Sequence, residues 1–148
     1  MKHSNQKKQK GYGLNLNLYF LLADDPQENF TYMDFDFSKQ KDKKLLIRER
    51  TQLSIVRYDE ITYLECDDKL VYVHHMKYDQ AFCYTKSLSE LECELNQFGF
   101  LRIHNNKVVN MQHVLSLNSK KREIRLSTLE ILTASRRKWQ KVKSFFNN

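Results

Sequence analysis

The sequence predicts a mostly β protein, in which strands are joined by hairpins and accompanied by a few short helices. Three observations support this fold class. Short runs of β-branched and aromatic residues are separated by polar pairs, which is typical of consecutive hairpins. One segment carries a complete helix-start signal. The C-terminal segment spaces its apolar residues at the period of a helix and is otherwise basic.

The length of 148 residues is enough to bury a core without a disulfide or a metal ion. We expect a compact domain at residues 44–148. Before it, residues 1–10 are polar and basic and predict a disordered tail, whereas the aromatic alternation in residues 12–37 predicts an accessory segment of one or two strands. Residues 38–44 (SKQKDKK) predict a polar linker.

Five runs in the first half of the domain predict strands, with polar turns between them. They lie at residues 45–50, 52–56, 61–66, 70–74 and 80–85. Asp67, Asp68 and Lys69 predict the hairpin turn between the third and fourth strands.

The helix-start signal lies at Ser87, which Glu90 follows at the spacing of a capping box. Gly99 is a natural helix stop. Between them, three leucines share one helix face: Leu88, Leu91 and Leu95. The sequence therefore predicts one amphipathic helix in the middle of the domain.

The rest of the domain predicts further strands and a last helix. Strand-like residues 100–103 precede a polar loop, and residues 108–117 show a mixed apolar alternation. A last hairpin is expected from residues 124–126 and 131–134, followed by a helix at residues 136–146. The residues of that helix expected to face inward are Trp139, Val142 and Phe146.

The basic charge of the chain is concentrated at its C-terminal end. The formal net charge is +7 and the isoelectric point is near 9.3. Residues 100–148 hold eleven Lys or Arg against two Glu, a balance of +9, whereas residues 44–99 hold seven against ten acidic residues, a balance of −3. A localised basic surface is the expected signature of a polyanion partner. A lysine-rich surface that only faces solvent is the alternative.

The three cysteines, Cys66, Cys83 and Cys93, form no C-x-x-C pair and lie in apolar-patterned segments. They predict buried free thiols of a cytosolic protein. The sequence shows no signal peptide, and its apolar stretch at residues 14–23 is short and interrupted by two Asn. A membrane-spanning helix needs about 20 apolar residues. We therefore expect a cytoplasmic protein without a membrane segment.

The polar loop at residues 104–107 is the first candidate binding site. It carries His104, Asn105, Asn106 and Lys107 between two apolar stretches. An Asn amide can pair bidentately with adenine, and Lys or His can donate to guanine or to phosphate. Asn-Asn is also good turn chemistry, so a plain structural turn is the alternative.

The start of the last predicted helix is the second candidate. Ser135 is the expected N-cap, and Arg136, Arg137 and Lys138 follow it. A helix N-terminus can bind phosphate through its free N–H groups, and Arg can form a bidentate contact with guanine. Cations here oppose the helix dipole, which hints at an anionic partner. A solvated basic face is the alternative.

The sequence predicts neither catalysis nor a cofactor. The adjacent carboxylates of Asp67 and Asp68 are ordinary turn residues. His74 and His75 point to opposite faces of a strand, so they cannot share a metal ion. The chain has no G-x-S-x-G motif and no Gly-rich phosphate loop. We expect a protein that is not an enzyme and binds no metal or other cofactor.

Residues 45–145 resemble the LytTR DNA-binding domain in four segments that keep the family's order and spacing. The most specific is GFLRIHNNKVVN (99–110), because the family has an aromatic-x-Arg-x-His motif, then a polar pair and a hydrophobic-Val-Asn ending. The other segments are YDEITYLECDDKLVYVHH (58–75), TKSLSELECEL (85–95) and LTASRRKWQKV (132–142).

The resemblance implies a mostly antiparallel β fold with a few short helices, which reads duplex DNA from loops in the major groove. The implied base contacts come from two segments: His104, Asn105 and Asn106 in the loop, and Arg137 or Arg136 at the last helix. Further contacts, mostly to phosphates, are expected from Lys69, Arg102, Lys107, Lys138 and Lys141. A structural role within the domain is the alternative for Arg102.

Three features depart from the family pattern. The loop reads HNNK, where an Arg-Ser or Asn-Ser pair followed by an apolar or aromatic residue is more usual, so Lys107 adds a charge. The last hairpin turn, at residues 127–130, lacks the Gly that is often present. The family is often fused to a receiver domain of about 100 residues or more, which the segment before residue 44 is too short to form.

Together these observations predict a transcription regulator that binds promoter DNA, on direct-repeat half-sites and as a pair of protomers. An RNA-binding protein is one alternative, since aromatic side chains can stack on bases. The core-type positions of Phe100, Trp139 and Phe146 argue against it. A protein-interaction module that modulates another regulator is the second alternative.

Overall fold

The computed structural model describes residues 35–77, 81–84 and 86–146. They belong to two compact units, one comprising the described residues of Asp36–Met111 and the other residues 112–146 together with Phe35. The predicted tail and almost all of the accessory segment, at residues 1–34, lie outside the described residues.

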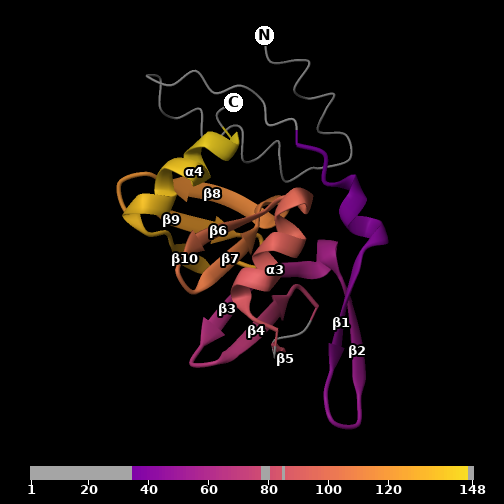
Figure 1. Cartoon of the computed structure of the whole chain (residues 1–148). Helices are drawn as coiled ribbons and strands as arrows, with labels where there is room; N and C mark the ends of the chain where they lie inside the picture. The colour runs from indigo at the N-terminus through magenta and orange to yellow at the C-terminus, as the bar shows by residue number, and fades with distance from the viewer. Residues whose placement is uncertain (1–34, 78–80, 85, 147–148) are drawn as a thin grey trace. The chain divides into compact units, whose positions relative to one another are not determined.

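A five-stranded antiparallel sheet forms the centre of the Asp36–Met111 unit (Figure 1). Its strand order is β5-β4-β3-β7-β6. The strands are β3 (Ile61–Asp67), β4 (Leu70–His75), β5 (Phe82–Tyr84), β6 (Phe100–His104) and β7 (Lys107–Asn110). The predicted DNA-reading loop connects β6 to β7. β7 pairs with β6 on one side and with β3 on the other, so both edges of the strand that follows the loop are hydrogen-bonded.

A separate two-stranded hairpin precedes this sheet and extends away from it in Figure 1. It consists of β1 (Lys44–Arg48) and β2 (Leu53–Arg57), paired antiparallel. Both strands alternate exposed and buried residues, so one hairpin face contributes to the core of the unit. Leu46 and Ile55 pair across the other face and are exposed.

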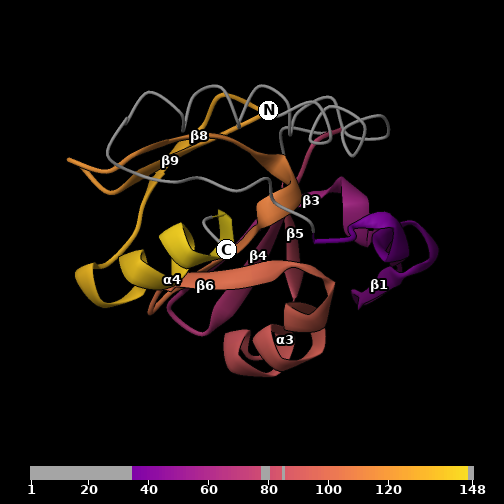
Figure 2. The ribbon, with the colours of Figure 1, turned by 90° about the horizontal axis from the view of Figure 1, so that it is seen from above.

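The predicted capping-box helix is α3 (Leu88–Leu95). The Glu90 N–H donates to Ser87 Oγ and the Ser87 N–H donates to the Glu90 carboxylate, both at 3.1 Å. The three leucines are buried, and the helix lies against β6 (Figure 2). The chain continues through the 3-10 helix η4 (Asn96–Phe98) and turns at Gly99, whose φ of 94° suits glycine.

The C-terminal unit contains a three-stranded antiparallel sheet of order β10-β9-β8. Its elements are β8 (Val114–Asn118), β9 (Glu123–Leu126), β10 (Ile131–Thr133) and helix α4 (Arg136–Phe146). The last predicted hairpin and the basic C-terminal helix are therefore confirmed. In the turn without Gly, Leu129 takes a φ of 74°, the left-handed conformation that glycine would adopt without strain.

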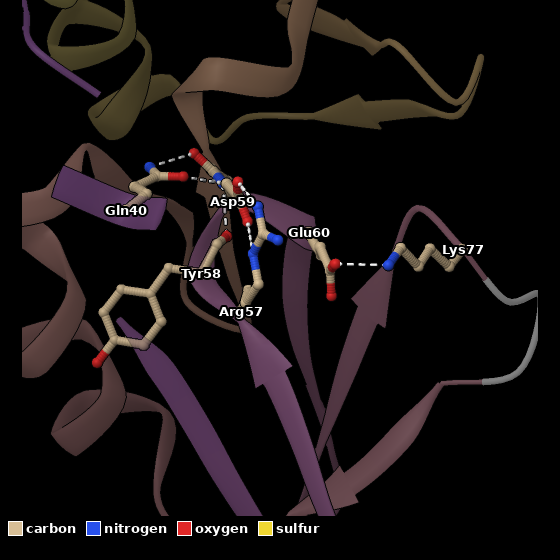
Figure 3. A network of polar contacts seen from close by, with 7 residues as sticks. Gln40, Arg57, Tyr58, Asp59, Glu60 and Lys77 are labelled. Carbon is tan, nitrogen blue, oxygen red and sulfur yellow. Dashed lines mark hydrogen bonds and ion pairs between the residues drawn. The ribbon is translucent and has the colours of Figure 1, made fainter. Parts of the chain in front are cut away.

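The prediction of a polar linker at residues 38–44 is wrong. Residues Ser38–Asp42 form the 3-10 helix η2, and Lys44 begins β1. Gln40 is completely buried, and its amide nitrogen donates to Phe98 O at 2.6 Å. The same nitrogen donates to Asn110 Oδ1 at 2.9 Å, a contact drawn beside Gln40 in Figure 3. Composition predicted a solvated linker because every residue in it is polar. The sequence did not show that one of these polar side chains has buried partners far along the chain.

The 3-10 helix η3 (Tyr58–Glu60) leads from β2 into β3, and polar contacts fix both of its ends (Figure 3). Arg57 forms an ion pair with Asp59 at 2.6 Å, and Lys77 forms one with Glu60 at 2.7 Å. Tyr58 is the first residue of η3, and its hydroxyl donates to Glu94 of α3 at 3.2 Å. Burial and the nearby Glu94 carboxylate raise the pKa of Tyr58 to about 12.

The raised pKa of Tyr58 predicts a loss of stability at alkaline pH. An unfolded tyrosine ionises near pH 10, whereas folded Tyr58 keeps its proton to about pH 12. The stabilisation is therefore complete below pH 10 and is lost as the pH rises through that window. Urea unfolding between pH 8 and 12 should show a smaller decline for Tyr58→Phe than for the unchanged protein. Parallel pH curves would contradict the assigned shift.

Candidate nucleic-acid contacts

The loop expected to read DNA is a tight turn between β6 and β7. His104 pairs with Lys107, which leaves Asn105 and Asn106 as the two turn residues. The strands that hold them are anchored in the core by Ile103 and Val108, both fully buried. The turn is therefore a rigid projection of the sheet, as a contact to a base edge requires.

Asn105 is the residue of this turn whose side chain is exposed. His104, Asn106 and Lys107 are each half-buried. His104 Nδ1 is buried and has no hydrogen-bond partner among the described residues. The exposed amide of Asn105 offers both a donor and an acceptor, which is the pattern that pairs with adenine.

Arg102, which the sequence suggested as a phosphate contact, is engaged within its own unit. Its Nη1 donates to Glu92 Oε1 of α3 at 2.7 Å, and its Nε donates to His104 O at 2.9 Å. Its Nη2 donates to Asn105 O. Only 17% of the Arg102 side chain is exposed. Its role toward DNA stays a prediction, and the geometry favours the structural alternative.

Lys107 also has a carboxylate partner. Its Nζ lies 3.4 Å from Glu65 Oε2, and the two residues face each other in the β3–β7 register. The same nitrogen donates to Asn106 Oδ1 at 3.4 Å. The extra charge in the HNNK loop is therefore balanced by Glu65. Neither Glu65 nor Glu92 was identified from the sequence, because no spacing relates them to the turn.

The predicted hairpin turn before β4 is present, and Asp68 takes a φ of 60° in it. Asp67, Asp68 and Lys69 are all exposed, so Lys69 is accessible to a ligand. His74 and His75 differ in burial as expected for opposite faces, and they stack on different rings, Tyr63 and Phe82 respectively.

The second candidate segment lies in the C-terminal unit, at the start of α4. Ser135 is the N-cap, since its Oγ accepts from the Lys138 N–H at 3.2 Å. Arg136, Arg137 and Lys141 are exposed, Lys138 is half-buried, and no ion pair to a carboxylate is found for these four side chains within residues 35–77, 81–84 and 86–146. The first turn of α4 contains no acidic residue. No carboxylate of the described residues therefore neutralises the positive charge at this helix end.

The apolar face of α4 is buried at Trp139, Val142 and Phe146. Phe100 is also buried. These aromatic rings cannot stack on bases in a folded protein, which weighs against the single-stranded RNA alternative.

The described residues contain no group of three or more His, Cys, Asp or Glu that could hold a metal ion. Cys66 and Cys83 are half-buried, but Cys93 is exposed on α3, so the prediction that all three thiols are buried is wrong. Cys93 faces outward because the leucines define the inner face of the helix. No described helix is long and apolar enough to span a membrane.

Comparison with known proteins identifies related DNA-binding domains. The family model of the LytTr DNA-binding domain matches residues 51–147, which include both candidate segments but not η2 or β1. A solved structure of the LytTr DNA-binding domain of a putative methyl-accepting/DNA response regulator from Bacillus cereus superposes with a TM-score of 0.63 at 19% sequence identity. The match covers 71% of this chain and 97% of that chain, which confirms the predicted fold class. The search of curated proteins gave no match. The chain belongs to the LytTr DNA-binding domain family.

Proposed function

We propose that this protein regulates transcription by reading the sequence of duplex DNA through two segments, the Asn105 turn and the start of α4. Membership of a DNA-binding family supports binding to DNA in general. The observation that carries sequence reading is the exposed Asn105 amide at the tip of a turn whose strands are buried. We assign it the contact to adenine.

Arg137 and Arg136 are assigned the second base contact, in the major groove, because both are exposed at a capped helix start without a carboxylate partner. Lys69, Lys138 and Lys141 are assigned to phosphates, which fix orientation but carry no sequence information. His104 and Asn106, both half-buried, are assigned supporting contacts beside Asn105. The protein would act on promoter DNA in the cytoplasm, with two protomers on direct repeats.

Selection of binding sites from random duplex DNA tests this function. It should be done at about 150 mM salt, because contacts to phosphates weaken steeply with salt. A short, repeated consensus is the expected result, and its repeat orientation reports how two protomers bind. Enrichment of no motif, with binding that salt abolishes, would reject sequence reading and favour a protein or RNA partner.

Lys141→Ala should weaken binding to every DNA sequence by a similar factor. If Lys141 contacts one phosphate, the slope of log K against log salt should fall by about 0.9. Fluorescence anisotropy at several salt concentrations measures that slope on a selected and on a scrambled duplex. Lys44→Ala, which removes an exposed lysine of β1, is the charge-matched control and should leave the slope nearly unchanged. A change confined to the selected duplex would contradict a phosphate contact.

A further inference from the structure

We propose that Arg102 and Glu92 form a positioning clamp that holds the DNA-reading turn, so that Asn105 can discriminate between bases. Neither side chain then contacts DNA itself. The inference rests on the proposed function, because it assigns to Asn105 the base contact that the clamp serves.

The clamp is built from three donors of one guanidinium. Arg102 donates to the carbonyl oxygens of His104 and Asn105 and to the Glu92 carboxylate. The planar guanidinium fixes the directions of these donors relative to one another. The β6–β7 register shifts between Arg102 and His104, and such irregularities re-aim side chains at the end of a hairpin.

Glu92 fixes the guanidinium from a second element. It projects from α3, whose first turn is fixed by the capping box and whose buried leucines pack in the core beside β6. Because only 17% of the Arg102 side chain is exposed, this ion pair is less screened by solvent than an ordinary surface pair. The position of the turn is thereby tied to a helix as well as to the sheet.

The remaining turn carbonyl is held on the opposite side. The Cys66 N–H of β3 donates to Asn106 O at 2.9 Å. Three successive carbonyls, those of His104, Asn105 and Asn106, are thus bound within the unit. Carbonyl oxygens carry partial negative charge and repel phosphates. Because these three carbonyls accept hydrogen bonds within the unit, the Asn105 side chain is the exposed polar group of the turn.

The clamp and a phosphate contact predict opposite results for Glu92→Ala. If Arg102 were a phosphate contact, removing Glu92 would free its charge and strengthen binding to all DNA. If Arg102 is a clamp, the same change loosens the turn and weakens binding to the preferred sequence alone. Arg102→Lys separates the two roles again, because lysine keeps the charge but cannot hold three acceptors in the guanidinium geometry.

Glu94→Ala is the matched control. It removes one carboxylate from the same helix, two residues away, so it changes net charge and helix propensity equally. It also breaks more than one contact, those with Lys86 at 2.8 Å and Tyr58 at 3.2 Å, but none with the turn. Any general effect of charge or of lost packing should therefore appear in this control as well.

Two measurements on the full chain test the proposal. The first is the ratio of affinities for the selected duplex and a scrambled one, which we expect to fall about tenfold in Glu92→Ala and in Arg102→Lys, a loss on the scale of one base contact. The ratio should not fall in Glu94→Ala. The second is amide hydrogen exchange without DNA, which should become faster at residues 104–107 in the first two variants and remain unchanged in the control.

The outcomes distinguish the clamp from the proposed function. An unchanged ratio in Glu92→Ala, or binding to both duplexes that is strengthened more than in Glu94→Ala, would overturn the clamp while leaving sequence reading intact. A protein that does not discriminate between duplexes at all would overturn the proposed function and, with it, the role of the clamp in discrimination. Hydrogen exchange at residues 104–107 would then still show whether Glu92 and Arg102 hold the turn. Unchanged exchange in Glu92→Ala and Arg102→Lys would overturn this positioning role as well.

Discussion

Asn110→Ala is expected to lower the free energy of unfolding by about 3 kcal/mol, because it leaves buried polar groups without a partner. The Asn110 amide is fully buried, and the two hydrogens of its Nδ2 are shared among three acceptors, Gln40 Oε1, Tyr58 O and Ile61 O, at 3.0, 3.1 and 2.8 Å. Its oxygen accepts from Gln40 Nε2. Alanine can satisfy none of these groups. Chemical denaturation, followed by circular dichroism, measures the change.

A double-mutant cycle with Gln40→Ala tests whether the two amides act as one unit. Each single change leaves the other amide without its hydrogen-bond partner. The double variant should therefore lose less stability than the sum of the losses in the two single variants. Asn96→Ala, at an exposed position after α3, is the control and should change stability by less than about 0.5 kcal/mol. Strict additivity of the Gln40 and Asn110 effects would show that the pair is not coupled.

This network also explains where sequence reasoning succeeded and where it failed. Strand pairs and α3 follow from local patterns, namely alternation and a capping box, and these elements were predicted within a few residues. Gln40 could not be predicted, because its partners Phe98 and Asn110 are 58 and 70 residues away and nothing local marks it as buried.

The candidate site shows the same division. The chemistry of Asn105 and Arg137 was visible in the sequence, because it depends on residue type and on the neighbouring motif. The engagement of Arg102 and Lys107 was not, since Glu92 and Glu65 reach them only through the folded arrangement of α3 and β3. A positive charge near a binding loop therefore predicts a DNA contact only after its carboxylate neighbours are known.

Asn105→Ala and Arg137→Ala combined are expected to remove about 2–6 kcal/mol of specific binding free energy, because each base contact contributes about 1–3 kcal/mol. We expect the two effects to add, as those of independent base contacts do. Anisotropy titrations of both single variants and the double variant, on the selected duplex, measure the sum. The double variant should bind that duplex hardly better than a scrambled one.

The matched control is Asn96→Ala combined with Arg48→Ala, which removes the same two residue types from exposed positions outside both candidate segments. It changes net charge by the same amount, so any general electrostatic loss should be equal in the two double variants. The Asn105 and Arg137 double variant should lose affinity beyond this shared amount, and that further loss should occur only on the selected duplex. If the Asn105 and Arg137 variants instead lost affinity equally on every duplex, these residues would contact phosphates, and sequence reading would have to come from other side chains.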